Sequence, residues 1–103
     1  MEGYVATIGM FDGVHRGHQF VLHQVVQAAR ERGLHSLAIT FDHSLRREQV
    51  LTSLDEKLAL IKGTGINRVE VLSFTDALRH MTAYDFMRQV LLQQLGVKVL
   101  LTG

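Results

Sequence analysis

Short apolar runs alternate with amphipathic stretches along the whole chain, and this alternation constrains the fold more than any other feature. Residues 4–8 and 36–41 are apolar runs of strand length, and residues 18–32 between them place apolar side chains at helical spacing. A strand, a helix and a strand of these lengths are typical of a parallel unit with a right-handed crossover. Gly33 is expected to end the helix in a left-handed conformation.

The same order continues to the end of the chain. Ser53 and Glu56 form a capping box that predicts the start of a second helix, and residues 69–72 follow as a third strand. Thr82 repeats the capping pattern before a third helix, and residues 97–101 form a fourth strand. We therefore expect an α/β fold of one domain, a Rossmann-like open parallel sheet with the order β-α-β-α-β-α-β.

The last predicted strand, residues 97–101, has no predicted helix after it. Parallel sheets are normally covered by helices on both faces. The sequence therefore predicts a fragment whose fold is incomplete at the C-terminus. An uncovered sheet would also offer a surface for self-association.

Composition narrows the class of protein. The chain is 47% hydrophobic and 20% charged, which is typical of a globular domain. Its net charge of +1 gives no electrostatic reason to bind nucleic acid or an anionic membrane. No apolar run approaches the roughly 18–20 residues that span a bilayer. The absence of cysteine excludes disulfides and thiolate metal sites and fits a reducing compartment. We expect a cytoplasmic protein with small-molecule partners.

The connection between the first strand and the first helix carries the most chemical information. It reads Gly9-Met10-Phe11-Asp12-Gly13-Val14-His15-Arg16-Gly17-His18. Such a turn directs backbone N–H groups and the positive end of a helix at whatever lies above it, which suits a phosphate. His15 and His18 add donors that become cationic when phosphate charge builds up. The turn therefore predicts half of a nucleotide-handling site.

Three of the other four histidines are assigned no role. His23 is expected to be a surface or a packing residue of the first helix, whereas His35 is expected before the second strand and His80 in a loop. None of the six histidines has a convincing set of metal-ligand partners, so no metal-ligating residues are predicted.

The residues of this turn resemble a known family. The string Thr7-Ile8-Gly9-x-Phe11-Asp12-Gly13-Val14-His15-x-Gly17-His18 is similar to the N-terminal adenylyltransferase module of bacterial bifunctional riboflavin kinase/FAD synthetase. The likeness continues at residues 40–42, 51–57 and 95–97 and so covers essentially the whole chain. The His-x-Gly-His tetrad is typical of the wider nucleotidylyltransferase superfamily, whereas the motif at residues 11–15 is specific to a much smaller group of proteins within it. The resemblance implies a partial FAD synthetase domain over residues 1–103, with the riboflavin kinase domain absent.

The resemblance also implies an activity. FMN would attack the α-phosphorus of ATP in the presence of Mg²⁺, giving FAD and pyrophosphate. His15 and His18 would hold the ATP phosphates and stabilise the transition state. The nucleotide-binding residues would be Gly9, Phe11, Asp12, Gly13 and Gly17. Because the family's second phosphate-binding segment lies beyond Gly103, the chain would be the ATP-binding half and inactive alone.

The sequence departs from the family pattern in two places. Family members carry a histidine-proline pair after the second strand, whereas here Asp42 is followed by His43 without a proline. His43, Arg46 and Arg47 are candidates for a substrate loop, although a solvated pair of charges is an alternative for the two arginines. Met10 stands where many members have asparagine.

Two other functions stay open at this point. One is another nucleotidylyltransferase, such as a cytidylyltransferase, which a preference for CTP over ATP would reveal. The other is a non-catalytic nucleotide-binding module, which would bind ATP without releasing pyrophosphate.

Overall fold

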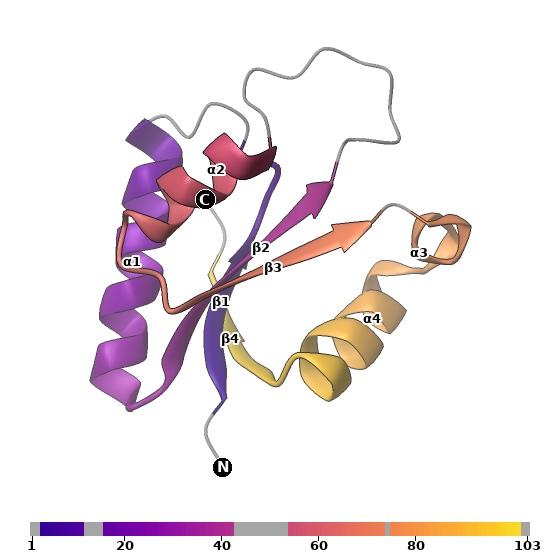
Figure 1. Cartoon of the computed structure of the whole chain (residues 1–103). Coiled ribbons are helices and arrows are strands. Elements are labelled where there is room, and N and C mark those ends of the chain that lie inside the picture. Colours follow the sequence, from indigo (N-terminus) through magenta and orange to yellow (C-terminus); the bar gives the residue numbers. More distant parts are fainter. Residues whose placement is uncertain (1–2, 12–15, 43–53, 74, 102–103) are drawn as a thin grey trace.

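The computed structural model describes residues 3–11, 16–42, 54–73 and 75–101, and these form an open sheet with helices on both faces (Figure 1). The four strands are β1 (Tyr4–Ile8), β2 (His35–Asp42), β3 (Arg68–Ser73) and β4 (Val97–Leu100). They are all parallel and lie in the order β3-β2-β1-β4. The predicted α/β fold, an open parallel sheet, is therefore confirmed.

The helices fall into two groups, one on each face of the sheet. The first group is α1 (Arg16–Arg32) and α2 (Leu54–Lys62), and the second is α3 (Asp76–His80), α4 (Ala83–Asp85) and the π-helical segment η1 (Phe86–Gln94). Figure 1 shows α1 and α2 on one side of the strands and α3 and α4 on the other. None of the helices that the structure describes is long and apolar enough to cross a membrane.

Each face of the sheet carries its own hydrophobic core. Val5 and Ala38 pack with Leu22 and Val25 of α1 and with Ile61 of α2. On the opposite face, a second cluster contains Ala6, Leu37, Ile39, Leu91 and Val97. Successive residues of a strand point to opposite faces. Because both faces are covered, β1 and β2 read as nearly continuous apolar runs rather than as alternating ones.

The ends of two elements were readable from local sequence. Gly33 has a φ of +68°, and the N–H of Leu34 donates to the Ala29 carbonyl at 2.9 Å, as expected after a left-handed helix end. The Thr82 side chain accepts a hydrogen bond from the Asp85 N–H at 3.0 Å, so this predicted cap is confirmed. The capping box at Ser53 lies outside the described residues.

Other local predictions need correction. The third crossover contains an additional short helix, α3, whose start is capped by the Thr75 hydroxyl accepting from the Leu78 N–H at 3.1 Å. His80, which the sequence placed in a loop, is the last residue of α3. His35 is the first residue of β2 rather than the residue before the strand. These differences arise because short helices and strand ends depend on tertiary contacts as well as on periodicity.

The position of β4 beside β1 determines where a ligand can bind. The chain runs from β1 outward through β2 to β3 and then returns to place β4 on the other side of β1. The strand order therefore reverses between β1 and β4, and ligands of open α/β sheets bind at such a switch point, outside the carboxyl ends of the strands. Within the described residues, Val97 packs on one face of the sheet, and Val99 and Leu101 pack on the other.

Candidate functional site

The candidate site begins where β1 ends. The Gly9 N–H donates to the Ile39 carbonyl of β2 at 3.0 Å, so the chain stays attached to the sheet for one residue beyond the strand. Met10 and Phe11 then lead away from the carboxyl edge, and α1 begins at Arg16. The N-terminus of α1 and the end of β1 therefore lie beside the switch point.

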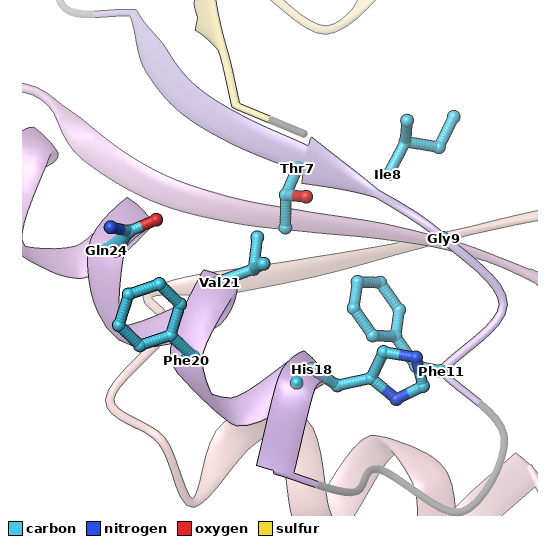
Figure 2. Close-up of a pocket in the computed structure, with 9 residues that line it drawn as sticks. Thr7, Ile8, Gly9, Phe11, His18, Phe20, Val21 and Gln24 are labelled. Atoms are coloured by element: carbon cyan, nitrogen blue, oxygen red, sulfur yellow. The ribbon is translucent and has the colours of Figure 1, made fainter. Parts of the chain in front are cut away.

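A pocket of about 660 Å³ opens between the end of β1 and the first turns of α1 (Figure 2). Its lining residues are Thr7, Ile8, Gly9, Phe11, Gly17, His18, Phe20, Val21 and Gln24. This volume falls within the range of about 300–1,000 Å³ that is usual for small-molecule sites. The lining combines an apolar wall with a few polar groups, which is also the usual composition of such sites.

Phe11 gives the turn its shape. Its backbone has a φ of +55°, in the left-handed region that non-glycine residues seldom adopt. Its side chain is only 3% exposed, and a Cβ added at Gly9 would lie 3.3 Å from two of its ring carbons. The absence of a side chain at Gly9 therefore leaves room for the Phe11 ring under the pocket.

His18 lies in the first turn of α1 and contacts Phe11. The two rings meet edge to face, with centroids 5.2 Å apart and planes inclined by 74°. Figure 2 shows both rings beside the turn, with His18 at the start of the helix. The N-terminus of α1, a helix of 17 residues, carries a partial positive charge. This charge adds to the attraction between an anion and any cationic or donor group at this position. His18 therefore lines the pocket beside the positive end of α1.

A buried lysine lies beneath the same turn. The Nζ of Lys57 donates to the Met10 carbonyl at 2.8 Å and to the Phe41 carbonyl at 3.1 Å, and its side chain is 2% exposed. The Thr40 hydroxyl also donates to the Met10 carbonyl, at 3.0 Å. The sequence analysis assigned Lys57 no role. A usable signal was its position four residues before Ile61, on the apolar face of α2.

The structure brings together part of the predicted site. Gly9, Phe11, Gly17 and His18 all line the pocket. Asp12, Gly13, His15, His43, Arg46 and Arg47 lie outside the described residues. Among the residues that are described, no group of three or more histidines and acidic residues could hold a metal ion.

The remaining described histidines lie away from this pocket. His23 is exposed on α1, so the surface alternative holds rather than the packing one, and it does not line the pocket. His35 lies near Tyr4, at the amino ends of the strands, with ring centroids 6.2 Å apart. The Nδ1 of His80 is 2.8 Å from the Asp76 carbonyl of its own helix.

Comparison with known proteins decides the family. The model of the FAD synthetase family matches residues 1–103. The chain belongs to the FAD synthetase family. The resemblance found in the glycine-rich turn is thus confirmed over the whole chain, and the comparisons support this family rather than the cytidylyltransferases.

Several relatives of this FAD synthetase family member are named bifunctional riboflavin kinase/FMN adenylyltransferase. The chain is 38% identical over 108 residues to the bifunctional riboflavin kinase/FMN adenylyltransferase of Pseudomonas fluorescens, with 99% of this chain and 35% of the relative covered. It is 34% identical over 109 residues to the Escherichia coli protein of the same name, again with 99% and 35% covered. A putative protein of this type from Geobacillus thermodenitrificans is 37% identical over 94 residues, covering 87% of this chain and 52% of the relative. The chain therefore spans about a third to a half of these relatives.

A solved structure supports the fold alone. The crystal structure described as a macrolide-efflux protein from Streptococcus pneumoniae superposes with a TM-score of 0.83 at 23% identity. It covers 99% of this chain and 36% of the other. The likeness confirms the open parallel sheet of this family member and carries no conclusion about activity.

Proposed function

We propose that residues 1–103 form the ATP-binding half of an FMN adenylyltransferase and contain no part of a riboflavin kinase domain. The observation that carries the proposal is the position of His18, in the first turn of α1 and facing a pocket at the switch point. Membership of the FAD synthetase family supports it. ATP and FMN are the proposed substrates, and FAD and pyrophosphate are the products.

The reaction needs positioning and charge stabilisation rather than a covalent catalyst. A phosphate oxygen of FMN forms a bond to the α-phosphorus of ATP, the bond from this phosphorus to the bridging oxygen breaks, and pyrophosphate leaves with that oxygen. Negative charge builds up on the phosphate oxygens during this transfer. His18 and His15 are proposed to donate to these oxygens, and the positive end of α1 adds a favourable potential.

The proposed ligands divide the pocket by chemistry. The phosphates of ATP would lie at Gly17 and His18, near the helix N-terminus, and the apolar wall formed by Ile8, Phe20 and Val21 suits the base. Mg²⁺ would be held mainly by the phosphate oxygens of ATP, since this ion commonly uses one or two carboxylates together with substrate phosphates. Asp12 and Gly13 would complete the turn. His43, Arg46 and Arg47 remain our candidates for the loop that meets the second substrate.

The first test uses His18 and a matched histidine. ATP binding is measured on residues 1–103, and FAD formation is measured after these residues are joined to the remainder of the domain from the Pseudomonas fluorescens relative. His18→Ala should lower kcat by about 10²–10³-fold, the effect of removing one transition-state donor, while ATP affinity changes much less. His23→Ala, on the same helix but outside the pocket, should leave both quantities unchanged.

The outcomes separate the alternatives. Equal losses of ATP affinity and kcat in His18→Ala would remove the transition-state role of this residue. Pyrophosphate release with CTP but not ATP would move the protein to another nucleotidylyltransferase. Tight ATP binding with no turnover in the joined protein would favour a non-catalytic binding module.

Location and self-association belong to the same proposal. We expect a cytoplasmic protein that binds small molecules and neither nucleic acid nor membranes, in keeping with its net charge of +1. Self-association is proposed beside the edge strand β4, where Leu100 of β4 and the neighbouring Tyr84, Met87 and Leu92 of α4 and η1 are exposed apolar side chains. Light scattering at high concentration tests this, and a monodisperse monomer would contradict it.

A further inference from the structure

We propose that Lys57 is a positioning residue, which fixes the backbone at Met10 and Phe11, where the turn after β1 begins, and through it the orientation of His18. Its consequence for ATP rests on the proposed function. The effect of Lys57 on the backbone of Met10 and Phe11 does not rest on the proposed function, because it follows from contacts among described residues alone.

The burial of Lys57 calls for a physical reason. A lysine ammonium taken out of water loses much of its solvation free energy unless it is hydrogen bonded. Lys57 is 2% exposed and lies on the face of α2 that also carries the buried Ile61, where an apolar side chain would pack without this loss. Its ammonium compensates by donating to the two backbone carbonyls of Met10 and Phe41. The charged side chain therefore joins the turn after β1 to the end of β2.

The Met10 carbonyl is held by two donors at once. Lys57 Nζ lies at 2.8 Å and Thr40 Oγ1 at 3.0 Å from the same oxygen. A carbonyl oxygen has two lone pairs, so these contacts can occupy both. The peptide plane between Met10 and Phe11 is thus held from the side of β2 and α2.

The orientation of this peptide has two consequences for the site. In a trans peptide the N–H points opposite to the carbonyl, so the Phe11 N–H is directed away from Lys57. Backbone N–H groups of this turn are expected to face a phosphate, and we include the Phe11 N–H among them because Phe11 is one of the expected nucleotide-binding residues and lines the pocket. The φ torsion of Phe11 is the rotation of its N–Cα bond relative to this peptide plane. It is +55°, which is unfavourable for a residue with a side chain. The hydrogen bonds at Met10 help to offset that cost.

The effect then passes from Phe11 to His18. With its backbone in this conformation, Phe11 turns its ring inward, where it is buried and meets the His18 ring edge to face at 5.2 Å (Figure 2). If the Met10–Phe11 peptide rotated, the ring would leave this position and His18 would lose the contact that orients it. The path from Lys57 to His18 consists of one hydrogen-bonded carbonyl, that of Met10, one constrained backbone torsion and one ring contact.

The test compares substitutions at Lys57 with one at an exposed lysine of the same helix. Lys57→Met keeps the length and the apolar stem but removes the donors, Lys57→Gln restores a neutral donor, and Thr40→Val removes the second donor to Met10. Lys62→Met, on the exposed side of α2, is the control. NMR follows the His18 ring signals and the Phe11 amide–α coupling, which reports φ, and calorimetry follows ATP affinity.

We expect Lys57→Met to shift the His18 ring signals and to change the Phe11 coupling. ATP binding should weaken by about tenfold, which corresponds to 1.4 kcal/mol, because the Phe11 N–H is displaced together with the His18 ring. Lys57→Gln and Thr40→Val should shift the same signals by smaller amounts, and Lys62→Met should leave every readout unchanged. A merely structural lysine would lower the unfolding temperature without moving the His18 and Phe11 signals of the folded protein.

Unchanged His18 and Phe11 signals in folded Lys57→Met would overturn the proposal. If this variant does not fold, unchanged signals in Lys57→Gln and Thr40→Val overturn it equally. Failure of the unsubstituted chain to bind ATP would instead refute the proposed function, and the NMR comparison would still decide whether Lys57 positions the turn.

Discussion

Two substitutions of Phe11 separate the contributions that its backbone conformation and its side chain make to the free energy of unfolding. Its ring is 3% exposed and its φ is +55°. Phe11→Ala removes the ring but keeps a side chain that disfavours this φ. Phe11→Gly removes the ring and also the steric conflict. We predict that the glycine variant is the more stable of the two, although glycine is normally the more destabilising replacement.

The magnitude follows from three terms. Loss of the buried ring should cost each variant about 3–5 kcal/mol. The left-handed conformation costs phenylalanine and alanine alike ~1–2 kcal/mol, and glycine is relieved of this cost. Glycine in turn loses about 0.4–1 kcal/mol because its unfolded chain has more conformational freedom. The central values of the two terms differ by about 0.8 kcal/mol, and the difference should favour Phe11→Gly over Phe11→Ala by that amount.

Urea unfolding followed by circular dichroism measures this difference, and Phe20 provides the matched control. Phe20 is 64% exposed within α1, where both replacements sit in helical backbone. There the ordinary order should hold, with alanine more stable than glycine by about 1 kcal/mol. If Phe11→Ala proves as stable as Phe11→Gly or more so, while Phe20 behaves as expected, the left-handed conformation of Phe11 is refuted.

Three further substitutions test contacts that stabilise the sheet and one of the helices around it. Ser36→Ala should destabilise the fold by about 1–3 kcal/mol, because the buried Ser36 hydroxyl donates to Asn67 Oδ1 at 2.9 Å and accepts from the Asn67 N–H at 2.8 Å; an unchanged urea midpoint would contradict this. Thr82→Ala should cost about 1 kcal/mol through loss of its helix cap, and thermal unfolding without a decrease in Tm would argue against the cap. In Gly3→Ala the added Cβ would lie 2.9 Å from the Gly96 carbonyl, so β1 and β4 must separate locally. Hydrogen exchange of the amide bonded to that carbonyl should accelerate, and retained protection would show that the strands tolerate the methyl group.

Local sequence was sufficient to predict the four strands and the main helices, although not the short helix α3, and to locate the candidate site at the end of β1. The strand and helix periods of β1, α1 and β2 follow from side chains that lie close together in the chain, and so do the left-handed end at Gly33 and the cap at Thr82. The glycine-rich turn was recognised as a candidate site for the same reason, and its family was confirmed. The roles of His15 and His18 stay predictions, and His15 lies outside the described residues.

Tertiary structure decided the features that depend on residues far apart in the sequence. No local pattern states that β4 pairs with β1 rather than with β3, yet this pairing creates the switch point beside which the pocket lies. The helical spacing of Lys57 places it on the apolar face of α2, but only the packing of α2 under the turn reveals that its charge binds the Met10 carbonyl. Periodicity reports which face of an element is buried, whereas the partner buried against it is set by how the whole chain packs.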